Sequence, residues 1–182
     1  MSKFQSLVSV MVAVAGLSGC ASTADLGPIR TEQNVDLERF MGDWYVIAAI
    51  PTFIEKKAYN AIESYELREP GIIDTTFSFR KGGFDGKVKE YTPVGFVRDD
   101  GSNAIWGMRF VWPFKAEYRI VYLDADYTQT VIGRTKRDYV WIMSRTPEMP
   151  PRDYEAIKAM LIKEGYDLSK LRVVPHRYDD DQ

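Results

Sequence analysis

The sequence predicts an all-β protein: an eight-stranded antiparallel up-and-down barrel with one C-terminal helix packed outside and a short extended tail. Three observations lead to this prediction. Short segments between residues 44 and 144 alternate with period two and are separated by Gly, Pro and Asp turns. Aromatic residues make up 13% of the chain, and such residues favour half-buried pleated surfaces. Only the segment after Pro150 changes to helical spacing.

The eight expected strands follow one another with short connections. They are predicted to span, in chain order, 44–50, 59–67, 72–80, 87–97, 103–111, 117–123, 128–134 and 139–144. Connections this short, with no helical pattern inside them, favour antiparallel pairing between neighbours. Closure into a barrel is then the simplest arrangement, because it removes the exposed strand edges.

The helix is predicted to begin at Pro150-Pro151 and to end at Gly165. Within it, Tyr154, Ile157 and Leu161 recur at spacings of three and four. A single amphipathic helix that follows a closed barrel has to pack against the outer wall. A short extended tail over 171–174 is expected after it.

The N-terminus has the three-part pattern of a secretory signal peptide, in which Lys3 precedes an apolar run and small residues follow. The run is shorter than the ~20 residues of a membrane-spanning helix. Leu17-Ser18-Gly19-Cys20 resembles the bacterial lipoprotein signal, whose cysteine is acylated and becomes the new N-terminus. Cys20 is the only cysteine, so no disulfide can form within the chain. Ala21 after it favours the outer membrane of a Gram-negative bacterium.

The expected organisation is a signal peptide (1–19), a lipidated Cys20 with a flexible tether (20–34), the barrel with its helix (35–178) and an acidic tail (179–182). A formal net charge of −2 gives no indication of a nucleic-acid surface. The only histidine is His176, and there is no clustering of His and Cys. We therefore expect no metal, no haem or other cofactor and no Ser/His/Asp hydrolase site.

Three motifs in order then resemble those of the lipocalin family, especially its bacterial outer-membrane lipoprotein members. The first motif runs from Phe40 to Tyr45, and its characteristic residues are Gly42 and Trp44. The second runs from Asp124 to Tyr127 and is marked by Asp126 and Tyr127. The third runs from Trp141 to Pro147 and contains Arg145. The resemblance spans roughly residues 28 to 177. These motif residues are expected to have structural roles. Trp44 should plug the closed end of the barrel, Arg145 should lie on its ring, and Gly42 should permit a backbone angle that a side chain would obstruct.

The resemblance implies a cavity that holds one small hydrophobic ligand. Alternation places Thr75, Phe77 and Phe79 inside. It also places Tyr59, Ala61, Glu63 and Tyr65 on one face, and Tyr118 and Tyr122 are interpreted as inward-facing. The candidate ligand-binding residues are Phe53, Tyr59, Phe77, Phe79, Trp106, Met108, Arg109, Tyr118 and Tyr122.

Such a cavity suits an amphiphile, so the predicted ligand is a fatty acid such as palmitate, or a lysophospholipid. The protein would store or transport it at the membrane that holds acylated Cys20, and the polar head would lie at the mouth near Arg109 or Lys115. Three alternatives stay open: a different hydrophobic or aromatic ligand, a lipid-modifying enzyme, and a structural envelope protein whose barrel is filled by its own side chains. Exposed aromatic residues could also serve a homodimer.

Overall fold

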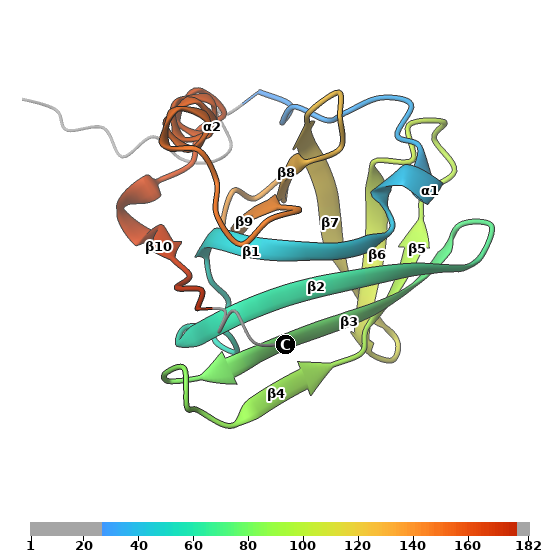
Figure 1. Ribbon diagram of the computed structural model, residues 1–182. Helices are drawn as coiled ribbons and strands as arrows, with labels where there is room; N and C mark the ends of the chain where they lie inside the picture. Colours follow the sequence, from blue (N-terminus) through green and yellow to red (C-terminus); the bar gives the residue numbers. More distant parts are fainter. Residues whose placement is uncertain (1–26, 178–182) are drawn as a thin grey trace, which may run out of the picture.

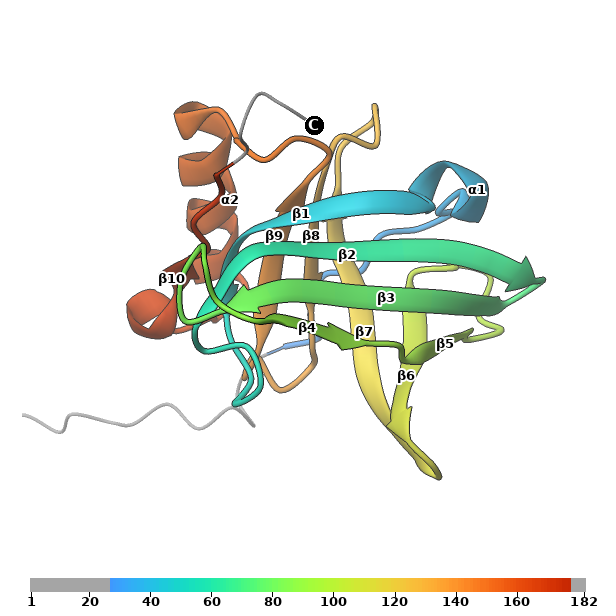
Figure 2. The same ribbon diagram turned by 60° about the horizontal axis from the view of Figure 1, so that its bottom comes forward.

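The computed structural model describes residues 27–177 (Figures 1 and 2). The predicted signal peptide, the acylation site at Cys20 and the acidic tail lie outside the described residues. Within residues 27–177, none of the helices has the length and apolar character needed to cross a bilayer.

The strands follow the predicted order, and most of their boundaries lie one to three residues from prediction. The helices are α1 (Leu37–Phe40), α2 (Pro151–Lys163) and the short 3₁₀ helix η2 (Leu168–Lys170). The strands are β1 (Gly42–Ile50), β2 (Ala58–Glu69), β3 (Ile72–Lys81), β4 (Val88–Tyr91), β5 (Val94–Val97), β6 (Ile105–Val111), β7 (Phe114–Leu123), β8 (Gln129–Gly133), β9 (Val140–Ser144) and β10 (Arg172–Val173).

The strands form the predicted closed antiparallel barrel of eight positions. The strands pair in the order β1-β2-β3-β5-β6-β7-β8-β9, and β9 pairs with β1 from Tyr45↔Ser144 to Ile50↔Val140, which closes the barrel. The strand predicted over 87–97 is divided into β4 and β5, which both pair with β3. The break falls at Thr92 and Pro93, because proline has no N–H to donate to the ladder.

Helix α2 packs outside the barrel, as predicted (Figure 1). Ile157 and Leu161 on its inner face are buried against β8 and β9, and Gly165 ends the helix region at φ 87°. This forms a second hydrophobic cluster, separate from the one inside the barrel. Both clusters lie within residues 27–177, so this part of the chain has a hydrophobic core of its own.

Two predictions about connections are wrong. The segment over 27–34 was expected to be part of a flexible tether, but Ile29 is buried and the Glu32 amide donates to the Ile120 carbonyl oxygen at 2.9 Å. The strand expected to begin at Glu117 begins instead at Phe114. Strands β6 and β7 are thereby joined by a tight turn at Trp112 and Pro113.

The barrel has two different ends (Figure 2). Helix α1 lies at the closed end, together with the connections after β2, β5, β7 and β9. The connections after β1, β3, β6 and β8 lie at the opposite end, which we call the open end. Four segments make up this open end: 51–57, 80–90, 109–117 and 134–139.

Candidate ligand-binding cavity

The closed end is sealed by Trp44 and Arg145, as the sequence predicts. The Trp44 indole is fully buried and donates from Nε1 to the Phe40 carbonyl oxygen at 2.8 Å. The Arg145 guanidinium carbon lies 3.8 Å from the centroid of the Trp44 ring. Gly42 has φ 90°, and an added Cβ there would lie 3.4 Å from Arg145 Nη1.

Arg145 also fixes the backbone around α1. Its guanidinium donates to carbonyl oxygens of Arg39, Phe40, Met41, Asp43 and Tyr127 at 2.8–3.3 Å. A planar group with several fixed donors can satisfy this many acceptors, whereas lysine has only one nitrogen. The predicted structural role of Arg145 is therefore confirmed by its contacts.

The second motif is held by a different carboxylate from the one predicted. Asp124 accepts from the backbone amides of Thr128 and Gln129 at 2.7 and 2.6 Å, whereas Asp126 is exposed. Tyr127 has φ 60°, and its hydroxyl accepts from the Asp36 amide at 2.9 Å. An aspartate that bonds backbone amides a few residues ahead stabilises a tight turn.

Aromatic rings fill the half of the barrel interior that adjoins the closed end. The rings of Trp106 and Tyr118 stack with centroids 4.6 Å apart and planes 7° apart. Phe40 meets the edge of Trp106 at 5.5 Å, and the Tyr118 hydroxyl lies 2.8 Å from that of Tyr65. This aromatic cluster forms a solid floor, so any ligand has to bind above it.

Above the floor lies a cavity of about 90 Å³. It faces the open end and is mainly apolar, with a few polar groups. Its lining residues are Thr52, Glu63, Thr75, Phe77, Pro93, Met108, Phe110, Ala116, Glu117, Tyr118, Arg134, Tyr139 and Trp141. The Thr75 hydroxyl is buried and has no hydrogen-bond partner among the described residues.

A carboxyl group stands at the floor of this cavity. Burial raises the pKa of Glu63 from 4.5 to about 7, although a hydrogen bond from the Tyr65 hydroxyl acts in the opposite direction. Glu55, on the loop between β1 and β2, also has a pKa raised by burial. Its carboxylate accepts from the Thr52 amide at 2.8 Å and from Trp141 Nε1 at 3.1 Å, which holds that loop against the barrel.

Five of the predicted ligand-binding residues point into the barrel, but only three line the cavity. Phe77, Met108 and Tyr118 line it directly. Phe79 lies beside it, 5.2 Å from Phe77 between ring centroids, and Trp106 belongs to the floor.

Tyr59 and Tyr122 are not in the cavity, contrary to prediction. A register shift in β2 follows Tyr59 at Asn60, whose φ is 46°, and Tyr59 packs outside against Phe84 and Arg172. A second register shift, between Ile120 and Tyr122, turns Tyr122 outward to the cluster beneath α2. An extra residue in one strand reverses the face of every residue beyond it, so strict alternation fails there.

The predicted head-group partners are also displaced. Arg109 and Lys115 lie on the outer wall, where the Arg109 guanidinium carbon is 4.7 Å and Lys115 Nζ 3.7 Å from the centroid of the Phe96 ring. Phe53 lies on the open-end loop after β1 and is 81% exposed, so it stands at the rim without lining the cavity.

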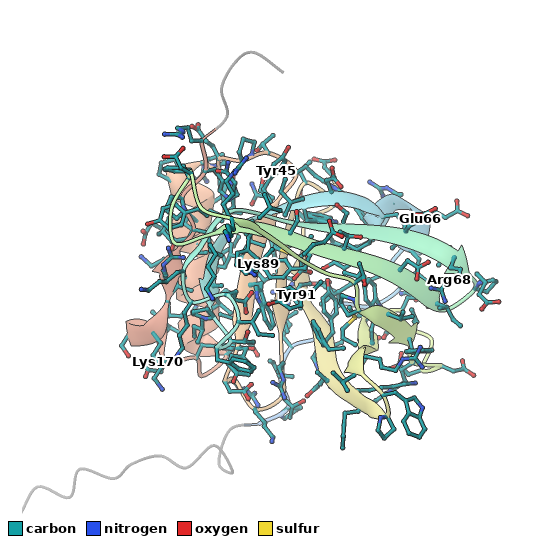
Figure 3. All side chains as sticks on the ribbon, turned by 90° about the horizontal axis from the view of Figure 1, so that it is seen from below. Tyr45, Glu66, Arg68, Lys89, Tyr91 and Lys170 are labelled. Atoms are coloured by element: carbon teal, nitrogen blue, oxygen red, sulfur yellow. The ribbon has the colours of Figure 1, made fainter. Side chains whose placement is uncertain are left out.

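Sequence reasoning missed two cations: Arg134, which lines the cavity, and Lys89 on the inner face of β4. Lys89 pairs with Phe79 and Tyr91 pairs with Phe77, so both share the inward face of β4, and Figure 3 labels them close together. Tyr91 stacks on Phe79 with planes 15° apart, while Lys89 is exposed at the mouth. The alternation of Lys89 with Tyr91 was the sequence signal that could have identified this lysine.

The comparisons with known proteins agree with this architecture. A family model described as a lipocalin-like domain matches residues 35–176. Temperature-induced lipocalin-1 of Arabidopsis thaliana is 31% identical over 155 residues, covering 79% of this chain and 80% of that protein. Outer membrane lipoprotein Blc of Citrobacter freundii is 28% identical over 167 residues, covering 91% of this chain and 93% of that protein.

A solved structure shares the fold. Insecticyanin from the tobacco hornworm Manduca sexta matches with a TM-score of 0.64 at 15% identity, covering 85% of this chain and 86% of that one. The family model spans most of the chain, including the barrel and α2. The closed barrel, the Trp44–Arg145 seal and the match to the family model together make this chain a member of the lipocalin family.

Proposed function

We propose that this protein is an envelope lipocalin that binds one fatty acid or lysophospholipid in its barrel, for storage or transport at the outer membrane. The observation that carries the proposal is the mainly apolar cavity beneath the open end, walled by Phe77, Met108 and Tyr118. An acyl chain gains about 0.8 kcal/mol for each methylene it buries, so a tail in this cavity supplies affinity without a specific partner.

The ligand has to enlarge the cavity as it enters. Small-molecule sites measure about 300–1,000 Å³, well above the volume found here. Phe110 lines the cavity but is 54% exposed, so its ring can swing outward at little cost in buried area. Entry would therefore begin between the β6–β7 hairpin and the loop over 51–57.

The charged groups favour one orientation of the ligand. A carboxylate or phosphate placed deep in the barrel would lie near Glu63 and be repelled wherever that group is ionised. At the mouth, Lys89 offers a positive charge on the inward face. We therefore place the acyl tail on the aromatic floor and the anionic head beside Lys89.

Anchoring through Cys20 is part of the proposal. The sequence Leu17-Ser18-Gly19-Cys20 supports acylation, and the similar Citrobacter protein is named an outer membrane lipoprotein. Several acyl chains on one residue hold a protein at a bilayer more firmly than a single chain does. The barrel would then receive its ligand close to the membrane surface. We propose no enzymatic step for it.

One observation favours a second candidate function, a structural barrel that carries no ligand. The aromatic floor and the small cavity leave little open space. The two functions differ in what the barrel does when a lipid is offered to it, so a binding experiment separates them.

The test is a titration of the protein with a fluorescent fatty acid. We expect saturable binding at one site per chain with micromolar or lower Kd. Ala116→Trp, which places a large ring in the cavity, should abolish it. Ala156→Trp is the matched control, because Ala156 lines a separate pocket beneath α2 outside the barrel. Absence of saturable binding favours the structural barrel, and stronger binding of an aromatic probe favours a different ligand class.

A further inference from the structure

Exposed apolar side chains are concentrated at the open end of the barrel. Eight large hydrophobic residues are exposed over residues 27–177, and six of them lie at or beside the four open-end segments. These six are Phe53, Val88, Phe110, Val111, Trp112 and Phe114. Large exposed apolar patches are rare on soluble proteins and mark sites of interaction with a protein or a membrane.

The β6–β7 hairpin carries most of this apolar surface. Val111, Trp112 and Phe114 are 69%, 78% and 76% exposed, and they occupy the tip of the hairpin. Figure 2 shows this tip projecting beyond the ends of the neighbouring strands. A narrow projecting tip offers too little area for a flat protein partner, but it can enter a deformable layer of lipid.

Charge is divided between the two ends of the barrel. The four open-end segments together contain eleven Lys and Arg and five Asp and Glu residues. The closed-end segments 36–43, 66–74, 97–104, 124–128 and 145–150 contain four Arg and eleven Asp and Glu, including Glu66 and Arg68 in Figure 3. The chain as a whole has a formal net charge of −2. The positive open end therefore results from where the charged residues lie, not from an excess of basic residues in the chain. A molecule charged in this way turns its open end toward an anionic surface.

The positive charges stand directly behind the apolar tip. Lys115 and Arg109 flank the hairpin on its outer side, and both lie over the Phe96 ring. The methylene groups of Lys115 lie against Gly107, where an added Cβ would come within 3.0 Å of Lys115 Cδ. An apolar tip with lysine and arginine behind it matches the order of layers in a membrane, with acyl chains beneath anionic head groups.

We propose that the open end docks on an anionic phospholipid bilayer, with the tip at Val111, Trp112 and Phe114 inserted among the acyl chains and Phe53 beside it. The exposed basic residues of the open end contact the head groups, and the acidic closed end points away. This docking does not depend on what the cavity binds. If the proposed lipid binding also holds, the mouth faces the layer from which a lipid enters.

The test uses residues 27–182, which contain both hydrophobic clusters and lack Cys20, so no acyl anchor contributes to binding. Vesicles of phosphatidylcholine mixed with phosphatidylglycerol are compared with vesicles of phosphatidylcholine alone by flotation. We expect binding to the mixed vesicles that weakens with added salt. Brominated phospholipid should quench the fluorescence of Trp112, and Trp112→Phe should remove that quenched signal. Trp44 and Trp106 are buried, and Trp141 faces the cavity, where its Nε1 donates to Glu55.

Two pairs of variants separate insertion of the hairpin tip from nonspecific hydrophobic binding and from an effect of net charge. Val111→Ser/Trp112→Ser/Phe114→Ser should weaken binding at least about tenfold, because it removes the apolar area that inserts. Ile162→Ser, which removes an exposed side chain on α2, should leave binding unchanged. Lys136→Glu at the open end should weaken binding, whereas Arg98→Glu at the closed end should not, although each reverses one charge.

Three results would overturn the proposal. They are absence of binding to the mixed vesicles, equal binding by the triple-serine hairpin variant, and a hairpin-dependent dimer in sedimentation without vesicle binding. The last would make the tip an interface between two copies of this chain. Fatty-acid binding by the same proteins is measured in solution without vesicles, so failure of docking and failure of lipid binding are distinguished.

Discussion

Replacing Glu63 with Gln tests the electrostatics of the cavity floor. Glu63 lies in the barrel interior, and burial raises its pKa from 4.5 to about 7. Glutamine has nearly the same shape and keeps an oxygen that accepts from the Tyr65 hydroxyl, but it carries no charge. The variant therefore changes the cost of ionisation and leaves the packing nearly unchanged.

The direction in which the free energy of unfolding changes with pH follows from proton binding by the folded and unfolded states. Below pH 4.5 the carboxyl is protonated in both, so its ionisation costs nothing. Between pH 4.5 and about 7 the unfolded chain releases the proton while the folded protein keeps it, so the free energy of unfolding falls as pH rises. Each pKa unit corresponds to about 1.4 kcal/mol, so the loss reaches up to about 3 kcal/mol by pH 8. Glu63→Gln should remove that loss.

The assay is urea denaturation of the wild-type protein and Glu63→Gln at pH 4 and pH 8. We expect the variant to gain up to about 3 kcal/mol relative to wild type on going from the lower to the higher pH. Glu55 and the other acids are present in both proteins, so their own titration is common to both, and only the repulsion between Glu55 and Glu63 enters the difference. The same difference at both pH values would mean that Glu63 is not buried from water and would refute this reasoning.

Three further substitutions test the seal, the cavity wall and the mouth. Arg145→Ala should lower the free energy of unfolding by about 2–4 kcal/mol in urea, because it removes the donor from partly buried carbonyl oxygens and uncovers Trp44. Thr75→Val should raise the free energy of unfolding by about 1 kcal/mol, because the Thr75 hydroxyl has no hydrogen-bond partner among the described residues. It should not weaken fatty-acid binding, and a loss of affinity would instead place the head group deep in the barrel. Lys89→Glu should weaken fatty-acid binding about fivefold at low salt while leaving a fatty alcohol unaffected, and equal effects on both would contradict the proposed orientation.

The sequence predicted the fold well because its strongest signals are local. Period-two alternation located the strands, and the change of spacing after Pro150 located α2. Trp44 and Arg145 were predicted to meet from the motif resemblance, and they do. The side chains of β3 alternate strictly, so Phe77 and Phe79 were placed correctly inside.

The residues placed wrongly share a physical cause. β2 has an extra residue at Asn60 and β7 has one at Val121, and each shifts the register of its strand. No local sequence pattern predicts which residue of a strand forms such a bulge. Tyr59 and Tyr122 were therefore assigned to the wrong face. Arg109 was chosen for its charge, although alternation with Met108 already placed it outside. The volume of the cavity was also beyond sequence reasoning, because it depends on how side chains from all the strands interlock.

The most direct test of lipid binding follows the methyl group of Met108 by NMR during titration with a fatty acid. Met108 lines the cavity, while Met160 lines the separate pocket beneath α2 and serves as an internal reference. We expect the Met108 resonance to shift and saturate at one fatty acid per chain, with close contacts to acyl methylene protons, while Met160 stays unchanged. An unchanged Met108 resonance with fatty acid in excess would contradict a lipid in the barrel.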